Sequence, residues 1–146
     1  MATINATLNL TSSDLTSSPL SLSKTMTMHK AGTCNGLELT SGLVKRKFTA
    51  VTEVDLLASG AQNYGTPTGT TNANKVYIKN TGSSSTAYFE IGFGNAAAGD
   101  ANQVALGRLY GGDWMLIPWL SAAASDITIQ PSTAEEMEVE YMLFFE

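Results

Sequence analysis

The chain is 146 residues long, which fits a single domain that buries about 70% of its unfolded surface. Only 14% of its residues are charged, below the roughly 25% typical of soluble domains. A surface with so few charges is compatible with a subunit of a larger assembly. The net charge of −5 argues against nucleic acid as the main partner, because phosphate binding needs clustered Lys and Arg. No apolar run is long enough to cross a bilayer, so we expect no membrane partner.

The charge is unevenly distributed along the chain. Five basic and four acidic residues up to Ala73 give +1, whereas three basic and nine acidic residues from Asn74 onward give −6. A basic patch of one copy could therefore meet an acidic edge of another. A solvated surface with an acidic end is the favoured alternative.

The beginning of the chain has neither a basic leader nor an apolar segment typical of export signals. We therefore expect synthesis in the cytoplasm. The single cysteine, Cys34, excludes an internal disulfide.

Two alternating segments follow. Apolar side chains recur at every second position over Ile4–Leu10 and, with one exception, over Leu20–Met28, and this pattern predicts two strands. The exception is Lys24, which falls on the apolar side; it either extends to water at a sheet edge or marks a bulge. The Ser/Thr-rich stretch between the segments predicts a linker. We therefore predict an N-terminal strand or arm with its linker over residues 1–19 and a β-sandwich domain over residues 20–146.

The middle of the chain combines a turn signal, a basic strand and a long loop. Asn35-Gly36 is typical of a type I′ hairpin turn, which needs positive φ at both central positions. Residues 43–51 form a predicted strand with three basic side chains, and residues 52–58 are the one place where a helical turn competes. Residues 59–74 lack periodicity and are rich in Gly, Thr, Asn and Pro. We predict a surface loop there, either a contact site or a mobile excursion.

The second half of the chain predicts a series of short strands with polar turns between them. Glycines in this half lack the strand-to-helix context of a phosphate loop and indicate bulges or close packing. With nine or ten strands and no convincing helix, the chain is predicted to be all-β: a single-domain antiparallel β-sandwich, jelly-roll-like, with an extended N-terminal segment. The predicted strands of this half are residues 75–79, 88–93, 104–109, 114–119, 126–130 and 136–145.

Reactive side chains are scarce. His29 has no second His, Cys or carboxylate at metal-ligand spacing, and it is the only base available to a Ser nucleophile. No Gly-x-Ser-x-Gly elbow is present. We therefore predict a protein that is not an enzyme, with no catalytic residue, no cofactor and no metal.

Glu136, Glu138 and Glu140 share one face of the last predicted strand. Carboxylates at this spacing could bind a hard cation or carry out acid–base chemistry. The favoured alternative is that they are solvated acids on an edge strand, where they discourage pairing with other chains. The sequence leaves open whether they meet Lys45, Arg46 and Lys47 of a neighbouring copy.

Trp114 and Trp119 lie on one short segment. Core filling is favoured for them, followed by anchoring of a protein interface and then by stacking on a sugar. The candidate interface residues of the whole chain are Ile4, Leu8, Tyr64, Trp114 and Trp119.

Three segments, Lys75 to Gly82, Gly107 to Trp119 and Val139 to Phe144, share short strands, polar turns and a late aromatic run. This texture, which covers about half of the chain, resembles small virion structural proteins of tailed bacteriophages. The resemblance implies a head decoration or cement protein on the capsid surface, often a homotrimer, whose partners are the major capsid protein and copies of itself. Its N-terminal arm could pair with neighbouring strands by β-augmentation.

Two other classes stay open. One is a tail, baseplate or fibre component that contacts host glycan through Trp114, Trp119 or the loop at residues 59–74. The other is a free carbohydrate-binding β-sandwich that belongs to no particle. The position of a label on virions separates the head from the tail, and glycan binding identifies the sugar-binding classes.

Overall fold

The computed structural model of the protein describes residues 3–14, 17–28, 39–59, 73–94, 104–120 and 125–145. These ranges contain eleven strands and no α-helix, so the all-β prediction is confirmed. The strands fall into two compact units, an N-terminal unit within Met1–Glu38 and a larger unit over Leu39–Phe145.

The N-terminal unit is a long antiparallel hairpin. β1 (Ile4–Ser12) and β2 (Leu20–Met28) pair over nine residues in one unbroken register, so both predicted strands are present and the bulge considered at Lys24 is not. The sequence assigned β2 to the following domain. The structure pairs it with β1, and the division between the two compact units falls after Glu38, whereas the sequence placed it after Pro19.

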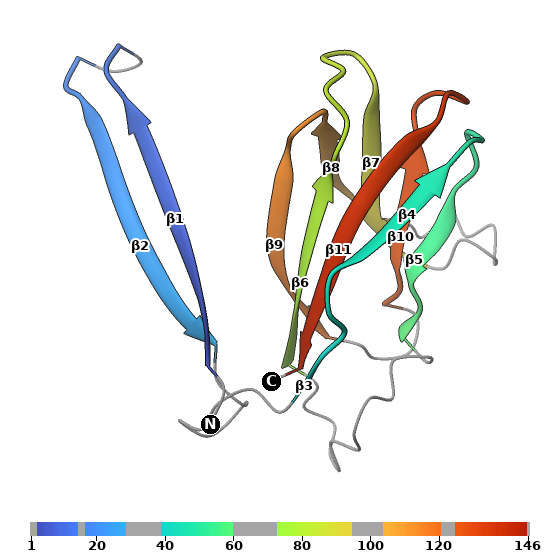
Figure 1. The fold of residues 1–146 in the computed structure, drawn as a ribbon, viewed down its shortest axis with the longest axis horizontal. Coiled ribbons are helices and arrows are strands. Elements are labelled where there is room, and N and C mark those ends of the chain that lie inside the picture. The colour runs from blue at the N-terminus through green and yellow to red at the C-terminus, as the bar shows by residue number, and fades with distance from the viewer. Residues whose placement is uncertain are drawn as a thin grey trace. The chain divides into compact units, whose positions relative to one another are not determined.

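The larger unit is a sandwich of two antiparallel sheets, as Figure 1 shows. The smaller sheet has the strand order β5-β10-β7-β8. In the larger sheet β6 lies between β9 and β11, and both β3 and β4 pair with β11 on its other side. The sandwich is thus established, whereas the jelly-roll arrangement stays a prediction. The strands of this unit are β3 (Leu39–Thr40), β4 (Val44–Phe48), β5 (Val54–Leu57), β6 (Ala73–Asn80), β7 (Tyr88–Phe93), β8 (Val104–Tyr110), β9 (Trp114–Leu120), β10 (Ile127–Pro131) and β11 (Met137–Phe145).

Both sheets contribute to one apolar core. Alternation along each strand puts one set of side chains inside, and Phe89 and Ile91 of β7 are buried together in this way, with Phe93 packed against the core. The core comprises Phe48, Leu56, Leu57, Val76, Ile78, Phe89, Ile91, Leu109, Trp119, Ile127, Ile129, Met137, Val139, Leu143 and Phe145.

Three local features follow from the pairing. The helical turn that competed at residues 52–58 is not formed: β5 pairs with β10, which buries Leu56 and Leu57. Pro118 lies on β9 at an edge of the larger sheet, where a missing N–H is tolerated. The register of β7 and β8 shifts between Ile91 and Gly92, which leaves Leu106 of β8 without an opposite residue. A Cβ atom at Gly92 would lie 3.0 Å from the Thr128 hydroxyl.

Asn80 connects the two sheets at one end of the sandwich. Its buried side chain donates from Nδ2 to the Leu109 carbonyl and accepts from the Gly82 N–H, both at 3.0 Å. Its backbone N–H donates to the Asp113 carbonyl, and its carbonyl accepts from the Gly112 N–H. Because Asn80 ends β6 and Leu109 lies on β8, this side chain joins a strand of the larger sheet to one of the smaller sheet.

Candidate functional site

The described residues hold no group of three or more His, Cys, Asp and Glu side chains that could bind a metal ion. They also contain no helix that is long and apolar enough to span a membrane. Several residues that the sequence singled out, namely His29, Cys34, Asn35-Gly36, Tyr64 and most of the long loop, lie outside the described ranges. Two surfaces remain as candidate sites: one face of the hairpin and the outer face of the larger sheet.

On the polar face of the hairpin, side chains of β1 and β2 hydrogen-bond to one another. The Thr27 hydroxyl donates to Asn5 Oδ1 at 2.7 Å, and the Ser23 hydroxyl donates to Asn9 Oδ1 at 2.6 Å. Between them, the hydroxyls of Thr7 and Thr25 lie 2.9 Å apart. These cross-strand pairs stabilise the ribbon from one side and fix its register.

Most of the opposite face of the hairpin is apolar and open to solvent, and Met28 at its end is buried. Leu8 and Leu10 of β1 and Met26 of β2 are 40%, 43% and 39% exposed. A two-stranded hairpin is at best marginally stable in water, and contiguous exposed apolar side chains mark interaction surfaces. The predicted interface residues Ile4 and Leu8 both lie on this surface, with Ile4 partly buried. The hairpin apolar face is formed by Ile4, Ala6, Leu8, Leu10, Leu20, Leu22, Lys24, Met26 and Met28.

Lys24 lies at the centre of the hairpin apolar face. It is exposed and pairs with Leu8, the middle residue of β1. Within the described part of the chain, its ammonium group makes no hydrogen bond or ion pair. Of the two alternatives that the sequence allowed, extension into water is therefore the one that the structure has.

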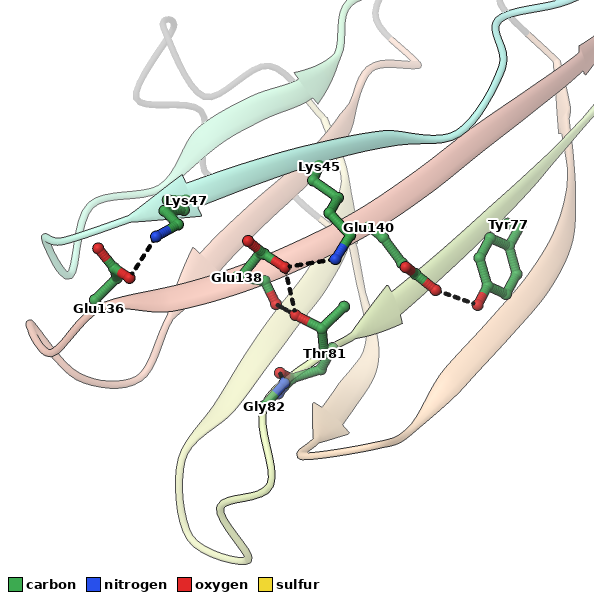
Figure 2. A network of polar contacts seen from close by, with 9 residues as sticks. Lys45, Lys47, Tyr77, Thr81, Gly82, Glu136, Glu138 and Glu140 are labelled. Carbon is green, nitrogen blue, oxygen red and sulfur yellow. Dashed lines mark hydrogen bonds and ion pairs between the residues drawn. The ribbon is translucent and has the colours of Figure 1, made fainter.

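A ladder of ion pairs crosses the outer face of the larger sheet, as Figure 2 shows. Lys45 Nζ lies 3.1 Å from Glu138 Oε1, and Lys47 Nζ lies 2.7 Å from Glu136 Oε1. The prediction that these acids occupy an edge strand is wrong, because β11 lies between β4 and β6. The antiparallel register places Lys47 opposite Glu138 and brings both lysines beside the acids of their own chain.

The charges of this ladder stabilise one another. The Lys45 ammonium and the Thr81 hydroxyl hydrogen-bond to Glu138 and lower the pKa of its carboxyl. The hydrogen bond and the negative charge of Glu136 raise the pKa of Lys47. Both shifts favour the charged forms, so the ladder is suited to ion pairing rather than to proton transfer.

Tyr77 and Trp114 form an aromatic pair beside the ladder. Their ring centroids lie 6.4 Å apart with the planes tilted by 41°, and Trp114 is 49% exposed. The Tyr77 hydroxyl donates to Glu140 Oε1 at 2.9 Å (Figure 2). Burial and this carboxylate raise the pKa of Tyr77 to about 12. A flat ring bordered by a hydroxyl and a carboxylate could contact a protein surface or a sugar.

Trp119 is a core residue, so its prediction as an interface residue is wrong and the core-filling alternative holds. Its side chain is only 2% exposed, and its Nε1–H donates to the Ser125 carbonyl at 2.6 Å. The reason is its spacing of five residues from Trp114, which places the two rings on opposite faces of β9. The spacing between the two tryptophans can be read from the sequence, so their placement on opposite faces could be predicted.

An open hollow of about 430 Å³ lies next to the ladder. Hydroxyl groups of Thr81, Ser83, Ser84 and Thr133 line it together with the acids and Lys47. The Thr81 hydroxyl donates to Glu138 Oε1 at 3.1 Å, and the lowered pKa of this carboxyl makes it a weak base.

Comparison of the chain with protein-family models, with curated proteins and with solved structures found no match. The resemblance to virion structural proteins therefore stays a prediction, and the surfaces of the protein itself carry the functional argument.

Proposed function

We propose that the protein is a non-enzymatic structural subunit of a tailed-bacteriophage particle, a head decoration or cement protein that binds across capsomer joints. The observation that carries the proposal is the N-terminal hairpin, a separate unit that holds an apolar surface open to solvent. Such a ribbon gains most of its stability when a partner covers it. In this proposal the hairpin apolar face packs on the major capsid protein.

The sandwich supplies the rigid body of such a subunit. Its core joins both sheets, and its outer face neutralises its own charges through the Lys45–Glu138 and Lys47–Glu136 pairs. A subunit of this kind acts by adding buried interface, and binding to the assembled state alone shifts assembly by mass action. No step of this role needs chemistry.

The test is to locate the protein and to remove the hairpin apolar face. Leu8→Ser combined with Leu10→Ser should abolish binding to capsids that lack the protein, while the thermal transition of the sandwich stays in place. Asn9→Ser combined with Thr11→Ser changes the opposite face of the same strand and is the matched control. Electron microscopy of labelled virions should show the wild-type protein over the whole head.

A label confined to the tail, or capsid binding that survives the Leu8 and Leu10 changes, contradicts the head role. A label at the tail favours the second candidate, a tail component that contacts host glycan. The specific observation behind this candidate is the half-exposed Trp114 beside the Tyr77–Glu140 hydrogen bond. Glycan binding by the purified protein that is lost in Trp114→Ala supports it.

A further inference from the structure

Sheet edges offer unpaired N–H and C=O groups to other chains, and proteins block them with short strands, charges, prolines or bulges. Every sheet edge of the sandwich formed by described strands has such a feature. β3 has two residues, β4 carries three consecutive basic residues, and β9 contains Pro118. β8 carries Arg108 and a register shift against β7, and β5 has four residues with Asp55 among them.

The two edges of the hairpin differ from each other. β2 carries Lys24 at its centre. β1, with the sequence Ile-Asn-Ala-Thr-Leu-Asn-Leu-Thr-Ser, has no charge, no proline, no glycine and no bulge over nine residues. Within the described part of the chain β1 pairs only with β2. Among the described edges, β1 alone is thus a long, regular and unprotected edge.

We propose that β1 pairs with β1 of a second copy of this chain, antiparallel about a two-fold axis at Thr7 or Leu8. The two hairpins then form one four-stranded sheet in the order β2-β1-β1-β2. The contact is isologous, because the same strand serves on both sides.

The side chains of the hairpin fit this partner. Directly opposite residues of an antiparallel pair share a face, and an axis at Thr7 or Leu8 pairs even-numbered with even-numbered positions. The apolar positions Ile4, Ala6, Leu8 and Leu10 therefore continue as one surface across the joint. The Asn and Thr side chains at the odd positions meet on the other face, where they can hydrogen-bond across the strands.

Charge decides between the two edges of the hairpin. Pairing through β2 would bring Lys24 of both copies onto adjacent strands, and like charges at such positions are destabilising. Pairing through β1 separates the two β2 strands by three inter-strand spacings, about 14 Å. That distance exceeds the Debye length of about 10 Å at 0.1 M salt, so the two ammonium groups are largely screened from each other.

The proposal does not depend on the particle role. A dimer that binds no capsid would contradict the proposed function and would leave the β1 contact intact. It also differs from the homotrimer that the resemblance implies, because a two-fold contact cannot close a ring of three.

The test is sedimentation velocity on the purified full chain and on two single variants. Thr7→Lys and Thr25→Lys remove the same hydroxyl pair and add one charge to the same face of the hairpin. They differ in the strand that carries the charge. The wild type and Thr25→Lys should sediment as dimers, and Thr7→Lys should associate more than about tenfold more weakly. A monomeric or trimeric wild type, or equal weakening by both variants, overturns the proposal.

Cross-linking provides the second measurement, in a Cys34→Ser background. A two-fold axis at Leu8 places the two thiols of Leu8→Cys opposite each other, and an axis at Thr7 does the same for Thr7→Cys. Opposite Cα atoms about 4.5–5.5 Å apart suit a disulfide. Lys24→Cys places the thiol directly across the same hairpin on β2. Oxidation should give a covalent dimer for Leu8→Cys or for Thr7→Cys, and none for Lys24→Cys. The opposite result identifies pairing through β2 or stacking of the hairpin faces and overturns the proposal.

Discussion

The hydroxyl of Tyr77 lies in surroundings that oppose its ionisation in two ways. Partial burial disfavours a phenolate, and the hydrogen bond to Glu140 would be replaced by repulsion between two anions. Together these effects raise the pKa of Tyr77 from 10 to about 12. Since the pKa in the folded state exceeds that in the unfolded state, this contribution to stability is complete below pH 10 and is lost as the pH rises through 12.

We expect an ultraviolet titration of the tyrosines to include a component near pH 12 that is missing in Tyr77→Phe. Glu140→Gln should move this component toward the ordinary pKa of tyrosine, because the amide can accept the hydrogen bond but carries no charge. Tyr88→Phe is the control and should leave the component in place. A component that survives in Tyr77→Phe would show that another tyrosine is responsible.

The hairpin and the sandwich are stabilised by different kinds of interaction. The hairpin depends on cross-strand side-chain pairs and has one apolar face exposed. The sandwich has a shared core and a small number of buried polar links, of which Asn80 connects β6 to β8. A buried amide that loses its partner costs more than an exposed one, because water cannot replace the lost hydrogen bond.

Asn80→Ala should therefore lower the free energy of unfolding of the sandwich by about 1–3 kcal/mol, since it leaves the Leu109 carbonyl without its donor. Urea unfolding should show a lower midpoint with an unchanged slope. Asn9→Ala removes an exposed amide from the hairpin and should change the unfolding of the sandwich by less than about 0.5 kcal/mol. Equal midpoints for Asn80→Ala and the wild type would show that the link contributes nothing.

At the scale of the whole molecule, local patterns proved easier to predict than partners. Alternation identified both hairpin strands and most strands of the sandwich, because burial on one face requires it. Alternation does not say which strands pair, so β2 was assigned to the wrong unit and β11 to an edge. Those assignments depend on contacts between residues far apart in the sequence.

The same distinction applies to the candidate site. The sequence selects Leu8 and Trp114 as interface candidates and both are exposed, although core filling is the favoured alternative for Trp114. The Tyr77–Glu140 and Lys45–Glu138 contacts could not be selected from the sequence, because they depend on the registers of β6 and β4 against β11. Once these registers are known, Glu136 and Glu138 are found in ion pairs with lysines of the same chain.

That pairing makes stability depend on pH at both ends of the scale. The pKa of Glu138 is lowered on folding, so its contribution is present above its ordinary pKa of 4.5 and is lost as the pH falls through the lower folded value. The pKa of Lys47 is raised, so its contribution is present below 10.5 and is lost as the pH rises through the higher folded value. Neutral pH therefore retains both contributions.

We expect the thermal midpoint of the sandwich to fall less steeply below pH 4.5 in Glu138→Gln than in the wild type, since the variant has no carboxylate to protonate at that position. Glu135→Gln is the matched control, because the Glu135 carboxylate makes no ion pair within the described residues. In this variant the thermal midpoint should fall with pH below 4.5 as steeply as in the wild type. Raised salt should reduce the difference between Glu138→Gln and the wild type at neutral pH, because both partners of the Lys45–Glu138 pair are open to solvent. If the thermal midpoints of Glu138→Gln and the wild type fell equally steeply below pH 4.5, the ion pair of Glu138 would not stabilise the fold.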